Sequence, residues 1–345
     1  MRARVSLLAL ALGCGHPPAV EAPSPGEARP PARFLKGQLH LHSSNSGDSE
    51  TPPQDVARWY ASRGYDFIVF TDHNRVTTGI ARADLQVIPG VELTFNVQDC
   101  DPPPEGPLCP LHVNALFVDP KPGLTTRPGD LRRTTVYRHL VAQARALGGL
   151  AQINHPNFHY GADLETIAAI AEGPLLLEVA NEAIDSNNAG DATHPSTFAI
   201  WDALLARGIR VWGTATDDAH HYEDADAVRA RGELAFEGDR GFEMVRGEAA
   251  ATVDEIEAAM ARGDFYASTG ALFDDLECAD GALRVWSKDP SAKLECVAGR
   301  PGSMPGVDAH GEGRVCLPGE GEHAYLRAEI TDAAGRRAWT QPCWR

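Results

Sequence analysis

Two histidines separated by a single leucine, His40 and His42, lie in the segment GQLHLHSS. If this segment is a strand, both imidazoles point to the same face, because side chains alternate between the two faces of an extended chain. Imidazole nitrogens are common ligands of zinc and other transition-metal ions. The same pattern also occurs on ordinary solvated strands, so a metal site requires further ligand-type residues elsewhere in the chain.

Residues of the ligand type recur at the ends of the strand-like segments that follow. They are Asp72 and His73 after the second segment, Glu92 after the third, His155 after the fifth, and Asp218 and His220 after the seventh. His112 stands at the start of the fourth segment. The carboxyl ends of the strands in an α/β barrel form one rim where catalytic groups gather, so we expect these side chains to converge.

The elements that would position these residues alternate between strands and helices. Strand-like segments cover residues 34–42, 66–73, 85–93, 111–118, 149–156, 175–181 and 209–220, and helix-like segments cover 52–64, 128–146, 162–171 and 195–206. This alternation predicts a parallel α/β architecture, either a barrel or an open sheet.

The motifs HLH, TDHN, PGVEL, NHP and DDAH, in this order within about residues 36–222, resemble the PHP superfamily, named for polymerase and histidinol phosphatase domains. The resemblance implies a distorted seven-stranded (β/α)7 barrel that holds two or three divalent metal ions. The ligands that it implies are His40, His42, Asp48, His73, Glu92, His112, His155, Asp218 and His220. Glu92 would bridge two metals, and Asp48 stands where some members have histidine. Asp217 competes with Asp218, although the D-x-H spacing favours Asp218.

This donor set of imidazoles and carboxylates suits borderline ions such as Zn, Mn or Fe, and it is too large for a single ion. Clustered metals activate water for attack on an ester. We therefore predict an exported metal-dependent hydrolase that cleaves a small phosphoester, with Glu92, Asp218, His220 and Arg75 as catalytic residues. The Arg75 guanidinium would neutralise a substrate phosphate or, alternatively, form a salt bridge at the rim.

Other polar residues near these motifs receive supporting roles. Asp72 would orient a metal ligand without binding the metal itself. Glu178 and Asn181 end the sixth strand-like segment, and we expect them to contact the substrate. Asn154 and Asn157 would make only local hydrogen bonds.

The C-terminal part has a different texture. After residue 270, short segments alternate apolar and polar residues between Gly and Pro turns, which predicts a small antiparallel β-domain at 271–345 behind a metallohydrolase barrel at 34–270. The motif FYASTG and the ending AWTQPCW resemble secreted PHP proteins of the carbaryl-hydrolase type. That resemblance implies an alternative reaction at the same metal site, hydrolysis of a carboxyl or carbamate ester or an amide. A further alternative is a non-catalytic surface module that binds a partner.

The N-terminus and the cysteines indicate export. Residues 1–14 read as a signal peptide whose end resembles a lipobox, with Cys14 as the lipidated residue, and an ordinary secretory signal is the alternative. A Pro-rich tether follows at 15–33. The other six cysteines predict disulfides, and Cys100 and Cys109 could close a local loop. We expect a periplasmic or outer-surface protein that touches a membrane only through a lipid anchor. The net charge of −17 argues against a nucleic-acid partner.

Overall fold

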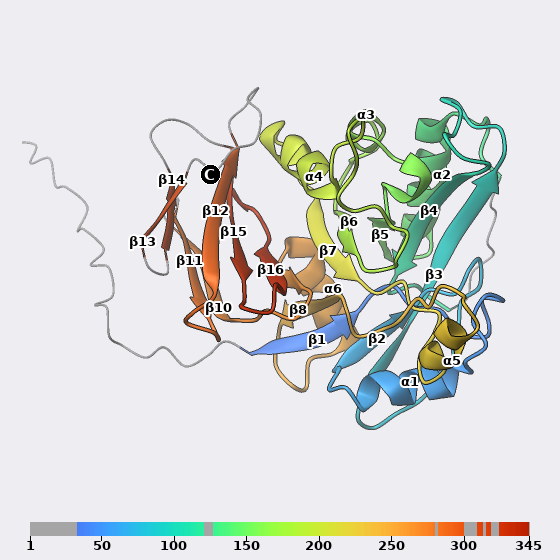
Figure 1. Ribbon diagram of the computed structural model, residues 1–345, viewed down its shortest axis with the longest axis horizontal. Helices are drawn as coiled ribbons and strands as arrows, with labels where there is room; N and C mark the ends of the chain where they lie inside the picture. The colour runs from blue at the N-terminus through green and yellow to red at the C-terminus, as the bar shows by residue number, and fades with distance from the viewer. Residues whose placement is uncertain are drawn as a thin grey trace, which may run out of the picture. The chain divides into compact units, whose positions relative to one another are not determined.

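A computed structural model describes residues 33–120, 127–279, 282–299, 309–312, 315–318 and 324–344. The predicted signal peptide, Cys14 and nearly all of the tether lie outside these residues. The elements (Figure 1) are, in chain order, β1 Phe34–Gln38, α1 Pro53–Ala61, β2 Phe67–Phe70, β3 Gln86–Val97, β4 Cys109–Leu116, α2 Arg133–Ala146, β5 Leu150–Ile153, the 3-10 helix η1 Phe158–Tyr160, α3 Leu164–Ala168, β6 Leu175–Asn181, α4 Thr197–Ala206, β7 Trp212–Thr216, α5 Ala225–Ala230, β8 Phe242–Arg246, α6 Val253–Arg262, β9 Phe265–Ser268, β10 Phe273–Ala279, β11 Ala282–Ser287, β12 Lys293–Gly299, β13 Ala309–Glu312, β14 Val315–Pro318, β15 Tyr325–Thr331, β16 Arg337–Thr340 and β17 Cys343–Trp344.

The prediction of a seven-stranded (β/α)7 barrel is wrong. The main sheet is a mixed sheet of 13 strands in the order β12-β15-β16-β9-β8-β1-β2-β3-β4-β5-β6-β7, with β17 paired to β15. The pairs β1–β2, β2–β3, β5–β6 and β6–β7 are parallel, whereas β3–β4 and β4–β5 are antiparallel. Neither sheet closes on itself among the residues that the structure describes.

The antiparallel strand β4 explains the error. In a parallel barrel each strand is followed by a crossover helix, but here β3 runs directly into β4 through a loop that the Cys100–Cys109 disulfide closes. All eight residues of β4 are buried, His112 and Asn114 included, as is typical of parallel strands that are covered on both faces. Hydrophobic periodicity identifies such a strand but says nothing about its direction.

The chain after β7 returns beside the chain after β1. The backbone N–H of Asp218 donates to the carbonyl of His40 at 3.0 Å, and the N–H of His42 donates to the carbonyl of Ala219 at 2.9 Å. These bonds lie beyond the ends of both strands, and no ladder joins β1 to β7 among the described residues. They bring the segments that follow the two strands into direct contact.

Helices α2, α3 and α4 pack on the half of the sheet that contains β4–β7, and apolar side chains of all three share one core with those strands. Ser196 caps the N-terminus of α4 by accepting from the N–H of Ala199 at 3.1 Å. Trp201 of α4 is fully buried and donates its indole N–H to the carbonyl of Val211 at 2.9 Å. This bond fixes α4 against the start of β7, one of the strands that lead to the site.

The C-terminal strands are antiparallel, as the sequence predicts, but β15 and β16 continue the main sheet through the β16–β9 pair. The strands β10, β11, β14 and β13 form a second sheet. Disulfides join Cys278 to Cys343 and Cys296 to Cys316, so all six of the cysteines that were expected to pair do so. Three disulfides are compatible with an oxidising, extracellular environment. Within the described ranges no helix is long and apolar enough to span a membrane.

Candidate metal centre

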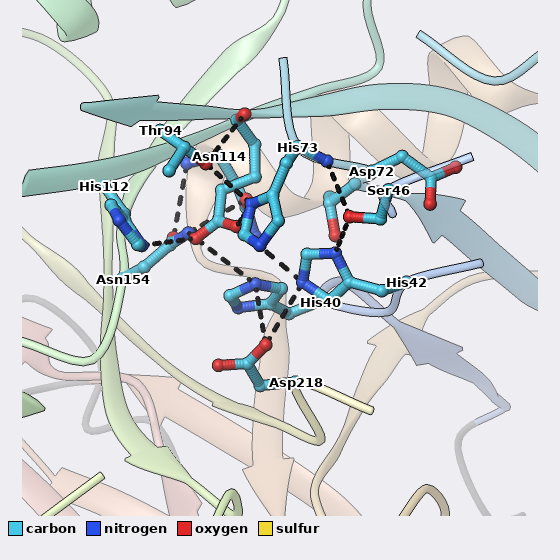
Figure 2. A network of polar contacts seen from close by, with 12 residues as sticks. His40, His42, Ser46, Asp72, His73, Thr94, His112, Asn114, Asn154 and Asp218 are labelled. Atoms are coloured by element: carbon cyan, nitrogen blue, oxygen red, sulfur yellow. Dashed lines mark hydrogen bonds and ion pairs between the residues drawn. The ribbon is translucent and has the colours of Figure 1, made fainter. Parts of the chain in front are cut away.

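Nine acidic and histidine side chains lie together where the ends of β1, β2, β5 and β7 meet β3 and β4. Figure 2 labels five of them, namely His40, His42, His73, His112 and Asp218. The nine side chains fall into three groups, two of which share His42, and within each group the ligand-type atoms all lie within 4.8 Å of one another. The groups are His42, Asp48, His73 and His220; His40, His42 and Asp218; and Glu92, His112 and His155. These are the nine residues that the sequence proposes as ligands.

Glu92 lies at the centre of the cluster, and its two oxygens face different histidines. Oε1 is 3.1 Å from His112 Nδ1 and 3.5 Å from both His40 Nε2 and His155 Nε2. Oε2 is 2.6 Å from His73 Nδ1 and 3.7 Å from His42 Nε2. A carboxylate with this placement can serve two neighbouring metal positions at once.

Two aspartates serve the remaining histidines. Asp218 Oδ1 is 3.2 Å from His40 Nε2 and 3.1 Å from His42 Nε2. Asp48 Oδ2 is 2.8 Å from His73 Nε2 and 3.3 Å from His220 Nε2. Asp218 therefore contacts the two histidines that follow β1, and Asp48 contacts one histidine after β2 and one after β7.

The antiparallel direction of β4 places His112 in the cluster. Glu92 lies in the middle of β3 and not near its end, because β3 continues to Val97 in a long ladder with β4. In that ladder His112 pairs with Thr94, two residues beyond Glu92. Since the start of β4 lies beside the end of β3, a histidine near the start of its strand meets ligands near the ends of others.

The ligand positions at the strand ends use unusual backbone conformations. His155 and Asp218 have positive φ angles of 24° and 51°, a region that non-glycine residues occupy rarely. At Asp218 this turn separates two consecutive aspartates. Asp218 faces the histidines, while Asp217 accepts from Tyr60 Oη at 2.8 Å and from the backbone N–H of Gly241 at 2.8 Å. Strain of this kind is often found at functional sites.

The electrostatics of the cluster suit ligands of a cation. Burial, aided by the neighbouring His220, lowers the pKa of His42 to about 3, so its imidazole is neutral. Burial opposes charge on His73, but Glu92 and Asp48 raise the pKa of this ring to about 10. Burial likewise opposes ionisation of Glu92, yet the surrounding histidines hold its pKa well below the ordinary value. The carboxylates are thus ionised, which metal binding requires.

Buried polar atoms without hydrogen-bond partners are a further reason why the cluster fits metal ions. His40 Nε2 and Glu92 Oε2 are buried and have no hydrogen-bond partner among the described residues. The close contact of Glu92 Oε2 with His73 does not have hydrogen-bond geometry. In addition, His112 Nδ1 and His155 Nε2 face each other at 3.2 Å. Buried polar atoms normally have partners, and buried imidazole and carboxylate atoms that converge on one point are an arrangement that a cation stabilises.

A layer of polar residues behind the cluster orients the rings. Glu178 accepts from His40 Nδ1 at 2.6 Å, Ser46 Oγ lies 2.9 Å from His42 Nδ1, and Asn96 Oδ1 lies 2.9 Å from His112 Nε2. Asn154 donates to Glu92 Oε1 at 2.8 Å. Such partners fix the tautomer and direction of metal-binding imidazoles.

Several of these residues have roles that the sequence did not indicate. Glu178 is fully buried behind His40, so its expected contact with substrate is replaced by a contact with a ligand. Asn154 holds Glu92, which is more than a local hydrogen bond. Asn181 touches both Glu178 and Asp218, at 2.9 and 3.2 Å, and also lines the cavity described next. Among these roles, only that of Glu178 had a signal, its position at the end of a buried apolar strand.

Asp72 and Arg75 follow β2. Asp72 accepts from the backbone N–H of Ser43 at 2.6 Å, so it holds the segment next to His42 and does not contact an imidazole. Arg75 is exposed and is not among the described residues that line the cavity at the cluster.

A cavity of about 310 Å³ opens onto the cluster. Besides seven of the nine ligand-type residues, its lining contains Asn96, Phe158, Asn181, Ala183, Asp185, Ser186, His221 and Phe236. No lysine or arginine is among the described lining residues. The cavity therefore combines carboxylates and imidazoles on one side with aromatic rings and small polar groups on the other.

No protein-family model matches this chain, and no curated protein matches it at a significant level.

Proposed function

We propose that this protein is a metal-dependent hydrolase of small esters. The observation that carries the proposal is the convergence of nine ligand-type side chains beside a cavity, where two buried polar atoms have no hydrogen-bond partner among the described residues. When bound, divalent ions lower the pKa of coordinated water and polarise an ester oxygen. The donor set is large enough for two or three ions of the Zn, Mn or Fe type.

The protein's own residues would prepare this reaction by holding the ligands in fixed directions. Glu178 keeps the proton of His40 on Nδ1 and leaves Nε2 free to bind metal. Asn154 holds Glu92, and Asn181 holds Asp218. Phe158 and Phe236 line the cavity, where apolar surface limits the access of bulk water to a bound ester.

The composition of the cavity bears on the bond that is cleaved. The sequence favoured a phosphoester, and a phosphate group is usually bound by arginine or lysine in addition to metal. The described lining has neither, and it carries the uncommitted carboxylate of Asp185. These observations favour the alternative, a carboxyl or carbamate ester without a strongly anionic group.

One experiment tests both the metal dependence and the type of ester that is cleaved. Protein purified without chelator is analysed for bound metals, and the same sample is assayed with p-nitrophenyl phosphate and p-nitrophenyl acetate. We expect two or more metals per chain, and cleavage of acetate over phosphate. His40→Ala and Glu92→Ala should lose metal and turnover together, whereas His139→Ala, a histidine on α2 outside the cluster, should retain both. A chain that takes up no Zn or Mn would refute the proposal.

A further inference from the structure

One carboxylate in the cavity is not engaged by the metal centre. Four carboxylates line the cavity, namely Asp48, Glu92, Asp185 and Asp218. Three of them contact imidazoles at 2.6–3.7 Å. Asp185 makes no side-chain hydrogen bond or ion pair with another described residue, and it is half-buried. A carboxylate that is held in an active-site cavity without a structural partner is available to the substrate.

The loop that carries Asp185 is fixed to the metal centre through Asn181. The N–H of Ser186 bonds to the carbonyl of Ala183 at 3.2 Å, which makes a turn with Asp185 near its tip. Ser186 Oγ donates to the carbonyl of Asn181 at 2.6 Å, and the N–H of Ala183 donates to Asn181 Oδ1 at 3.0 Å. Because the Asn181 amide also contacts Asp218, the position of Asp185 is tied to that of a proposed ligand.

We infer that Asp185 is the general acid that protonates the leaving oxygen, an inference that rests on the hydrolase function proposed above. In this step water forms a new bond to the ester carbonyl carbon, and the bond from that carbon to the leaving oxygen breaks. The carboxyl proton of Asp185 passes to the leaving oxygen, so that an alcohol departs in place of an alkoxide. The proton released by the attacking water then restores the acid, and the products are one carboxylic acid and one alcohol.

The surroundings of Asp185 agree with this role. Burial and the negative charge of Asp218 raise its pKa, while His155 and His159 act in the opposite direction. These three are the ionisable groups whose charges act on it most strongly, and Phe158 and Ser186 are uncharged neighbours in the lining. General acids work best when their pKa approaches the working pH, which a partly desolvated carboxyl does better than an exposed one.

His221 is the other acid–base group in the lining without a ligand role, and it is less suited. Its Nδ1 accepts from the backbone N–H of Phe236 at 3.1 Å, which fixes the ring as a neutral imidazole. Burial also lowers its pKa, so that a proton for donation as imidazolium is scarce at neutral pH. Asp185 is therefore the better donor on the described wall of the cavity.

The experiment compares Asp185→Asn with the unchanged protein on acetate esters of p-nitrophenol, phenol and ethanol, in order of increasing leaving-group basicity. A general acid contributes most when the leaving group is poor. We expect losses in kcat that grow along this series, to about 10²-fold or more for the ethyl ester. Asp185→Glu should restore part of the loss, and Asp191→Asn, an exposed acid further along the same loop, is the control.

A second measurement does not depend on activity. In metal-free protein with carbon-13 at the aspartate carboxyls, the resonance that is lost in Asp185→Asn should titrate above the ordinary value of 3.8 in the unchanged protein. Equal losses on all three esters, or a titration of that resonance at or below 3.8, would refute the assignment of Asp185. If the unchanged protein binds no metal and cleaves no ester, the proposed function has failed instead, and the two failures are thus distinguishable.

Discussion

The substitution Glu178→Gln removes the partner of His40 while keeping its size. Glu178 accepts from His40 Nδ1 at 2.6 Å through one oxygen and from the backbone N–H of His155 at 2.6 Å through the other. A glutamine amide can accept on only one side. If its NH₂ faces His155, two donors oppose each other, at a cost of about 1–3 kcal/mol. If its NH₂ faces His40, the ring must carry its proton on Nε2, the nitrogen that would bind metal.

Either orientation therefore weakens metal binding. Loss of a residue that orients a ligand typically reduces metal affinity by about 10–100-fold. This factor corresponds to about 1.4–2.8 kcal/mol, which is similar to the cost of the opposed donors. We expect the substitution to lower the affinity for Zn²⁺ or Mn²⁺ by this factor with little change in the fold.

The assay is a competition titration against a metal chelator of known affinity, with circular dichroism as a check on folding. Glu243→Gln is the matched control, since Glu243 is also a fully buried glutamate in the main sheet but contacts no imidazole. The control should change metal affinity by less than about threefold, well below the expected effect. An affinity in Glu178→Gln within about threefold of the unchanged protein would refute the claim that Glu178 sets the tautomer of His40.

Two further predictions concern stability. Glu243 accepts from the N–H of Ala215 at 2.8 Å through one oxygen, and its other oxygen has no hydrogen-bond partner in the part of the chain that the structure describes. Burial raises its pKa well above 4.5. The unfolded chain then loses this proton first as the pH rises, and the folded protein loses stability above about pH 4.5. Urea unfolding should therefore show Glu243→Gln gaining on the unchanged protein by about 1.4 kcal/mol per pH unit until the folded pKa is reached. A constant difference would contradict this. Arg327 of β15 is buried and pairs with Asp202 of α4 at 2.6 and 2.7 Å. Arg327→Met should cost about 3–5 kcal/mol in the same assay, and adding Asp202→Leu should recover much of it; an equally unstable double variant would contradict a role of the unpaired charge.

The sequence indicated the ligands better than the fold that holds them. A metal ligand must be one of a few residue types, and its placement after a short apolar strand is visible in the pattern, as at His73 and His155. All nine proposed ligands consequently lie in one cluster. Strand direction has no such mark, and a buried strand such as β4 is compatible with parallel or antiparallel neighbours.

The residues that orient the proposed ligands were harder to predict, because their residue types are common everywhere in a sequence. Asn154, Ser46 and Thr94 are residues of the kind that occur at most turns and strand ends, and only the folded arrangement shows which side chain of the cluster each one contacts. Asp217 and Asp218 illustrate the same limit. They are adjacent and chemically identical, and a single positive φ angle decides which of them reaches the imidazoles.

The mixed sheet also explains how a site without a closed barrel can gather ligands from so many strands. Parallel strands contribute the residues that follow their ends, as β1, β2, β5 and β7 do here. An antiparallel strand in the middle must contribute a residue near its start, and His112 occupies that position. The hydrogen bonds between the segments after β1 and β7 then join the two halves of the cluster. Convergence therefore requires only that these ends meet, and a continuous ladder around the sheet is not needed.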